Sequence, residues 1–195
     1  LFRSVLNKLD YLAELGVEVL YFNPLFVSPS NHKYDTQDYW HIDPHFGKIV
    51  RESGSVLAAD AKTNETASLY AARTTADENL AASDALFAEL IQQAHARGMR
   101  VILDGVFNHC GAFHKWLDRE GLYRGKLRGA YRYADSPYHD YFYWNADGTY
   151  EGWWGYENHP KLNVEGCAAL REELLAIERR WVSPPFDADG WRLDV

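Results

Sequence analysis

The pattern of apolar and polar positions predicts a helix followed by a strand near the N-terminus. Residues 4–15 place apolar side chains close to a 3.6-residue period, and Gly16 follows where a helix commonly ends. Residues 17–22 then form a short, nearly continuous apolar run that stops at Asn23-Pro24. We expect an amphipathic helix and then a buried parallel strand.

The same order recurs twice downstream. Ser83 can cap an amphipathic helix that Gly98 ends, and residues 99–106 form a second buried strand. A third copy consists of a helix over residues 168–181, a Pro-Pro break and a strand over residues 190–195.

Three helix–strand units in succession predict an α/β fold, because parallel neighbours need a crossover connection that helices supply. Two architectures fit: an open doubly wound sheet and a (β/α)₈ TIM barrel. No glycine-rich phosphate loop follows any of the three strands, which counts against the dinucleotide-binding form of the open sheet. Barrel enzymes keep their chemistry at the carboxyl ends of the strands. The polar residues near these ends are Asn23, Asp104, Asn108, His109, Arg192 and Asp194.

Two long insertions interrupt this pattern. Residues 48–82 are rich in Ala, Thr, Asn, Asp and Glu and predict a surface excursion that is partly helical. Residues 110–160 hold 14 of the 29 aromatic residues and 7 of the 14 glycines, which predicts an inserted lid subdomain over the active-site end. The expected division is a barrel segment over 1–109, the lid over 110–160, and a barrel segment over 161–195.

Composition and charge exclude several classes of protein. A chain of 195 residues with 47% hydrophobic and 25% charged residues is typical of a globular protein. Its net charge of -8 would repel a phosphate backbone, so we expect no nucleic-acid partner. No run approaches the ~18 apolar residues of a membrane span. Cys110 and Cys167 are too few for a disulfide scaffold or a cysteine-rich zinc site.

The strand near the C-terminus carries a paired Arg and Asp. Residues two apart on a strand point to the same side, so Arg192 and Asp194 share a face. The Arg would keep the carboxylate ionised and fix its orientation, as a carboxylate nucleophile requires. The alternative is a structural ion pair at a strand end.

The middle strand ends in Asp104, Asn108 and His109, which could bind sugar hydroxyls or a metal. His109 could donate a hydrogen bond to substrate, carry a proton or ligate a metal; the alternative is a hydrogen-bonded histidine at a strand end. A zinc site using His109, Cys110 and His114 matches no standard ligand spacing.

A polar run over residues 30–39 forms the third candidate element, a loop directly after the first strand. Tyr34 offers a stacking face with a hydroxyl tip, and Asp35 and Asp38 offer acceptors. The alternative is an ordinary solvated loop.

Together these segments resemble the α-amylase clan, glycoside hydrolase family 13. Residues 104–109 match the family's Asp-x-Val-x-Asn-His signature at the third barrel strand, and residues 190–194 match its Gly-x-Arg-x-Asp signature at the fourth. Residues 32–47 look like the loop after the second strand that supplies a stacking tyrosine. Residues 160–163, Pro-Lys-Leu-Asn, are similar to the motif of the neopullulanase, cyclomaltodextrinase and maltogenic amylase subfamily.

The resemblance implies a partial (β/α)₈ TIM barrel containing the second to fourth strands, with the lid inserted after the third. It implies that Asp194 is the catalytic nucleophile and Arg192 its orienting partner, whereas Asp104 is structural and lies below the substrate. The family's general acid, a Glu on the fifth strand, falls beyond residue 195. A full barrel takes about 250 residues, so we expect these residues alone to be inactive.

The resemblance also implies a sugar-binding subsite. His109 hydrogen-bonds the sugar in the cleavage subsite, Tyr34 stacks on that sugar, and the subsite is shaped by His32 and Asp35. Sugar C–H faces pack well on aromatic rings. The further aromatic candidates near the end of the lid are Trp153, Trp154 and Tyr156.

The family requires no cofactor, although Asn108 is a calcium ligand in many relatives, so calcium is a candidate. Two departures from the family pattern stand out. Position 159 is His where the subfamily motif has Met, and residues 48–82 are longer than the usual connection.

The predicted function is hydrolysis, with retention, of α-1,4 links in maltooligosaccharides, cyclodextrins, pullulan or starch. The alternatives are a catalytically inactive amylase-like module that binds carbohydrate or protein, and a metal-dependent barrel hydrolase using His109 and Asp194. Subfamily members often form homodimers through a domain N-terminal to the barrel. The chain begins with Leu1 rather than Met, so position 1 need not be the natural start. Its first residues form no apolar leader, and we expect a cytoplasmic location.

Overall fold

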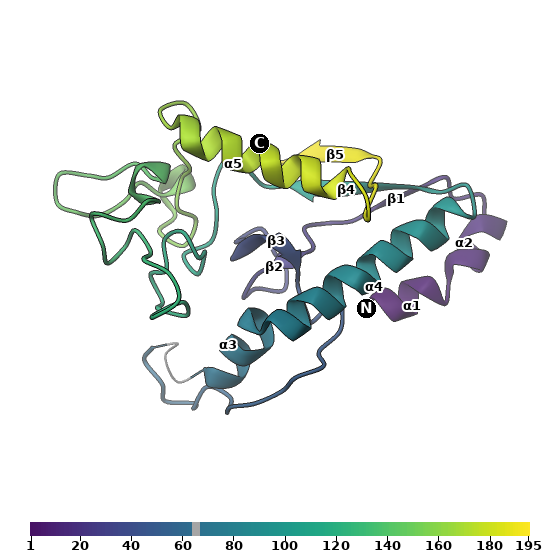
Figure 1. The fold of residues 1–195 in the computed structure, drawn as a ribbon, viewed down its shortest axis with the longest axis horizontal. Coiled ribbons are helices and arrows are strands. Elements are labelled where there is room, and N and C mark those ends of the chain that lie inside the picture. Colours follow the sequence, from purple (N-terminus) through teal and green to yellow (C-terminus); the bar gives the residue numbers. More distant parts are fainter. Residues whose placement is uncertain (64–66) are drawn as a thin grey trace.

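The structure, a computed structural model, describes residues 1–63 and 67–195. At its centre three parallel strands form a sheet in the order β1 (Val19–Tyr21), β4 (Arg100–Gly105) and β5 (Gly190–Leu193), as Figure 1 shows. Each strand lies within the range that the apolar runs predicted. The α/β class with a parallel sheet is therefore confirmed.

The central strand, β4, pairs with a parallel strand on each side. Val101 and Leu103 are almost completely buried, whereas Asp104 at its carboxyl end is directly opposite Arg192 of β5. The pairing register thus places the polar ends of β4 and β5 side by side.

Two short helices, α1 (Phe2–Leu6) and α2 (Leu9–Glu14), replace the single helix predicted over residues 4–15. The break falls at Lys8, whose backbone N–H donates to Val5 O at 2.8 Å, three residues back rather than four. Phe2 and Leu9 are both fully buried, one on each side of the break. Packing of these two side chains on the core prevails over helical continuity.

The two long helices are α4 (Asp77–His95) and α5 (Ala168–Trp181). The start predicted for α4 is wrong: Ser83 lies inside the helix, fully buried, and its hydroxyl donates to Asn79 O at 2.7 Å instead of capping. The limits of α5 agree with the prediction. No helix in the described part of the chain is both long and apolar enough to cross a membrane.

An antiparallel hairpin follows β1, which sequence analysis did not predict. Its strands are β2 (Phe26–Val27) and β3 (Asp38–Ile42), so the last two residues of the loop predicted over 30–39 belong to β3. Two residues are too few for a strand pattern to be recognised. The hairpin is anchored by Tyr39, which is fully buried and whose hydroxyl lies 2.7 Å from the carbonyl oxygens of both Val106 and His109, so that its one proton is shared between them.

The insertion over residues 48–82 consists of exposed chain over residues 50–60, the helix α3 (Ser68–Thr75) and the first turns of α4. In Figure 1 α3 continues the line of α4 below β2 and β3.

The aromatic-rich segment, residues 110–160, is built mostly from turns, with two 3₁₀ helices, η2 (His139–Tyr141) and η3 (Trp153–Gly155). Figure 1 shows it beyond the end of the sheet toward which the β5 arrow points. Much of its aromatic content packs internally. Its buried aromatic residues are Trp116, Tyr123, Tyr141, Phe142 and Tyr150.

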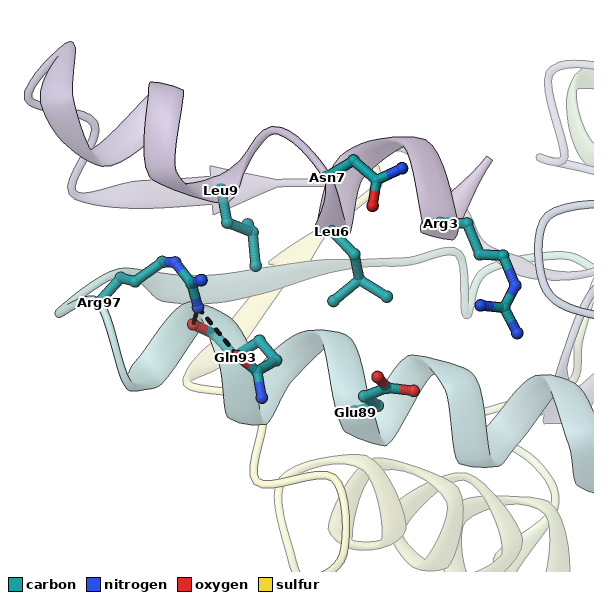
Figure 2. A pocket seen from close by; sticks show the side chains of 7 residues that line it. All are labelled: Arg3, Leu6, Asn7, Leu9, Glu89, Gln93 and Arg97. Atoms are coloured by element: carbon teal, nitrogen blue, oxygen red, sulfur yellow. Dashed lines mark hydrogen bonds between the residues drawn. The ribbon is translucent and has the colours of Figure 1, made fainter.

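A cavity of about 290 Å³ lies between α1, α2 and α4 (Figure 2). Arg97 on its wall donates to the side chain of Gln93 at 3.0 Å and to Asp10 at 2.7 Å. Arg97 precedes β4, so this cavity lies toward the amino ends of the strands, away from the polar carboxyl ends.

Candidate active site

A fully buried carboxylate, Asp104, lies at the centre of a polar cluster at the carboxyl ends of the strands. Nη1 of Arg192 donates to Asp104 Oδ1 at 3.1 Å and to Asp194 Oδ1 at 2.7 Å. These hydrogen bonds, to Asp194 and then to Asp104, raise the pKa of Arg192 above its usual value. A single guanidinium therefore holds both carboxylates, and of these two contacts the shared strand face predicted the one with Asp194.

Two tyrosine hydroxyls also bind Asp104. Tyr21 donates to Asp104 Oδ2 at 2.5 Å, and Tyr34 donates to the same oxygen at 3.1 Å. Burial and the neighbouring carboxylate raise the pKa of Tyr21 to about 12 and also raise that of Tyr34, so both hydroxyls keep their protons at neutral pH. Sequence analysis missed Tyr21; its position at the end of β1, beside β4, was the available signal.

Asp194 stays accessible while its orientation is held. Its side chain is 20% exposed, and its backbone N–H donates to Gly105 O at 2.9 Å. The side-chain amide of Asn108 donates to Asp194 O at 3.1 Å. One carboxylate oxygen of Asp194 is thus bound by Arg192, and a molecule entering from solvent can reach the group.

His109 is buried and neutral. Its Nδ1 faces Asn108 Oδ1, an acceptor, so Nδ1 carries the ring proton and Nε2 keeps its lone pair. Nε2 is buried without a hydrogen-bond partner in the described part of the chain. Burial and the neighbouring His159 lower the pKa of His109 to about 4, against the opposing influence of Asp194. The ring is therefore uncharged at neutral pH.

Aromatic rings surround His109. Trp153 stacks on it, with ring centroids 6.0 Å apart and planes 19° apart, and Trp154 is 82% exposed next to Trp153. His159, the departure from the subfamily motif, meets His109 edge-on at 5.0 Å, and its Nδ1 is also buried and unpartnered among the described residues. Burial lowers the pKa of His159 too. Trp154 is the more exposed of the two tryptophans.

The loop between β2 and β3 brings the remaining predicted residues together. His32 stacks against Tyr34 at 6.1 Å, and its Nδ1 accepts from the Tyr34 backbone N–H at 3.2 Å. Asp35 accepts from the hydroxyls of Ser28, at 2.7 Å, and Ser30. The side chain of Asp35 is therefore oriented before any ligand binds.

A buried ion pair holds this loop. Nζ of Lys33 lies 2.8 Å from Asp43 Oδ2, and both side chains are almost fully buried. Burial raises the pKa of Asp43, but hydrogen bonds from His45, Lys33 and Ser28 outweigh it and leave the pKa below its usual value. A lysine in a polar loop gives no sequence signal of burial, so sequence analysis missed Lys33.

The loop also packs closely on the chain that follows His109. Gly111 donates its N–H to Thr36 O at 2.8 Å. A Cβ at position 111 would lie only 2.4 Å from the backbone oxygen of Asp35. A glycine is therefore required here for the two segments to meet.

The metal alternatives find no support in the contacts. His114 is fully buried, with Tyr39 and Trp116 at 5.0 and 4.1 Å between ring centroids, and Cys110 is a buried free thiol. Residues 1–63 and 67–195 contain no group of three His, Cys, Asp or Glu side chains that could hold a metal. Both polar atoms of the Asn108 side chain are engaged within the protein. Calcium at Asn108 stays a prediction.

The predicted site residues form connected groups at this end of the sheet, and Trp154 joins them through its ring contact with Trp153. The main group runs through successive contacts in the order His32, Tyr34, Asp104, Arg192, Asp194, Asn108, His109 and Trp153.

Comparison with known proteins finds a matching family and similar chains. The chain matches the family described as alpha amylase, catalytic domain, over residues 2–65 and 77–195. An amylopullulanase from Thermoanaerobacterium thermosulfurigenes is 39% identical over 212 aligned residues, which cover 99% of this chain and 9% of that protein. An intracellular maltogenic amylase from Bacillus subtilis (strain 168) is 36% identical over 194 residues, covering 99% of this chain and 26% of the relative.

Among solved structures, a cyclomaltodextrinase superimposes with a TM-score of 0.67 at 31% identity, covering 100% of this chain and 27% of that one. The chain thus spans from 9% to 26% of the length of the two curated relatives.

The family match includes both signature segments, residues 104–109 and 190–194, whose polar side chains meet around Asp104. It leaves out residues 66–76, which contain α3. Because the match extends over nearly the whole chain and confirms the resemblance drawn from its motifs, this chain belongs to the alpha-amylase catalytic domain family.

Proposed function

We propose that this chain carries the nucleophile side of the active site of a retaining α-glucan hydrolase. The observation that carries the proposal is that one guanidinium binds two carboxylates: Arg192 donates hydrogen bonds to both the buried Asp104 and the accessible Asp194. Of these two acids only Asp194 can be reached from solvent, because the Asp104 side chain is fully buried. We therefore assign attack to Asp194 and a supporting role to Asp104.

In the proposed mechanism a carboxylate oxygen of Asp194 attacks the anomeric carbon. The glycosidic C–O bond breaks as a general acid protonates the leaving oxygen, and water then hydrolyses the covalent glycosyl-enzyme with the same group acting as base. By family resemblance that acid is a Glu of the fifth strand, outside these residues. For this reason we propose that residues 1–195 alone do not turn over substrate.

The neighbouring side chains would position the sugar. Neutral His109 offers Nε2 as an acceptor for a sugar hydroxyl, which would satisfy an otherwise unpartnered buried atom. His32, Tyr34 and Asp35 would form another part of the subsite, and the exposed ring of Trp154 would bind a sugar unit further along.

The proposed substrates are α-1,4-linked glucans: maltooligosaccharides, cyclodextrins, pullulan or starch. The names of the relatives, an amylopullulanase, a maltogenic amylase and a cyclomaltodextrinase, support this class. We also propose that the three strands are the second to fourth of the barrel and that residues 110–160 act as its lid. A cytoplasmic location and a homodimer in the full-length protein remain part of the same proposal.

The test is to express the complete open reading frame and assay it on cyclodextrin, pullulan and starch. Asp194→Asn should reduce kcat by at least about 10³-fold, the scale of losing a covalent nucleophile. Asp60→Asn, at an exposed position of the insertion, is the matched control and should leave kcat unchanged. Proton NMR of the first product should show the α-anomer.

Two outcomes would overturn the proposal. Full activity in Asp194→Asn would remove the nucleophile assignment. A protein that binds these glucans but hydrolyses none of them would instead be the catalytically inactive binding module.

A further inference from the structure

The segment that the family match leaves out forms one wall of a second pocket. Residues 66–76 lie outside the match, and α3 within them contributes Tyr70 and Arg73 to a pocket of about 300 Å³. Pro29, His45 and Phe113, which lie outside this segment, line the same pocket. The insertion therefore completes a hollow that those residues alone would leave open on one side.

The pocket offers apolar faces to a ligand. The rings of Tyr70 and His45 lie parallel, 6.1 Å apart with planes 10° apart, and Phe113 meets Tyr70 edge-on at 6.1 Å. Leu57, which also lines the pocket, is 43% exposed. Flat rings beside aliphatic side chains suit the C–H face of a sugar.

One polar group in the wall has no partner. Arg73 pairs through Nη2 with Glu52, whereas its Nε is buried and makes no hydrogen bond within residues 1–63 and 67–195. A buried donor without a partner is unfavourable unless a ligand or water satisfies it. Because Glu52 already balances the charge of Arg73, this wall of the pocket suits a neutral hydroxyl better than an anion.

The pocket borders the loop that carries Tyr34 and Asp35. Pro29 stands between Ser28 and Ser30, whose hydroxyls bind Asp35. The Tyr70 hydroxyl donates to Gln37 Oε1 at 2.6 Å, two residues beyond Asp35. A glucan chain leaving the catalytic subsite along this loop would therefore meet the pocket.

We propose that this pocket, defined by Pro29, His45, Leu57, Tyr70, Arg73 and Phe113, binds a glucosyl unit of the substrate remote from the bond that is cleaved. The proposal rests on the α-glucan hydrolase function proposed above. It assigns to the insertion the role of extending the substrate-binding cleft, so its contribution should increase with the length of the glucan.

The test compares Arg73→Met and Arg73→Lys with Arg51→Met in the product of the complete open reading frame. Arg73→Lys keeps a cation for Glu52 but lacks Nε. Arg51 is in the same insertion, pairs with exposed Glu78 and does not line the pocket, so Arg51→Met is the matched control. The substrates are maltotriose, maltoheptaose and soluble starch, with kcat and KM measured separately.

Both Arg73 variants should raise KM several-fold for maltoheptaose and starch, with kcat and the maltotriose constants unchanged, while Arg51→Met behaves as wild type. Equal KM changes for short and long substrates, or none, would overturn the proposal. Calorimetric titration with maltoheptaose decides the question separately from hydrolysis. If the protein proves inactive, weaker binding in the Arg73 variants still supports the pocket, and unchanged binding refutes it.

Discussion

Acidification should destabilise this protein through His109, and the size of the effect follows from its burial. The ring is 4% exposed, and its pKa falls from 6.5 to about 4. Between those values the unfolded chain binds a proton that the folded protein does not, so stability is lost as the pH falls through this window. A difference of 2.5 units at about 1.36 kcal/mol per unit gives a loss of about 3 kcal/mol.

The assay is urea unfolding of the complete protein and of His109→Gln at pH 7.5 and at pH 4. Groups common to both proteins, including the buried His114 and His159, contribute to both losses. The wild type should therefore lose about 3 kcal/mol more than the variant over this range. NMR titration of ¹³C-labelled histidine, assigned with the variant, should give His109 a pKa of about 4. Equal losses in the two proteins, or a pKa near 6.5, would refute the reasoning.

Two further predictions concern the loop that carries Tyr34. Gly111→Ala should lower the free energy of unfolding by ~1–3 kcal/mol, because its Cβ would meet backbone atoms of Asp35 at 2.4 and 2.7 Å. Gly190→Ala, whose Cβ would have a nearest contact of 3.4 Å, is the control. Equal losses in the two variants would contradict this reasoning. Lys33→Met should cost ~3–5 kcal/mol by leaving buried Asp43 without its cation, measured by urea unfolding, and a loss as small as that of an exposed ion pair would contradict it.

Regular periodicity made the sheet and the long helices predictable. The runs around residues 17–22, 99–106 and 190–195 contain β1, β4 and β5. The helix α5 has the predicted limits because a stripe of buried side chains runs along its length, formed by Leu170, Leu174, Ile177 and Trp181. The errors occur where tertiary contacts prevail over local pattern. The first predicted helix breaks between the buried side chains of Phe2 and Leu9. Ser83 lies inside α4, where its hydroxyl donates a hydrogen bond to the carbonyl of Asn79.

The candidate site likewise contains residues that sequence spacing predicted and residues that it did not. Spacing alone paired Arg192 with Asp194, because residues two apart on a strand share a face. It could not find Tyr21, Lys33 or His159, since each acquires its role from a residue distant in sequence: Tyr21 from Asp104, Lys33 from Asp43 and His159 from His109.

By itself, the sequence determined the α/β class, the family and the residues at the ends of three strands, because backbone periodicity and short motifs are local properties. Only the tertiary structure decided which of those residues are buried and which can be reached. Asp104 and Asp194 are both aspartates bound by Arg192, yet the side chain of the first is fully buried and that of the second is 20% exposed. Solvent access, which depends on every neighbouring element, separates a supporting carboxylate from a candidate nucleophile.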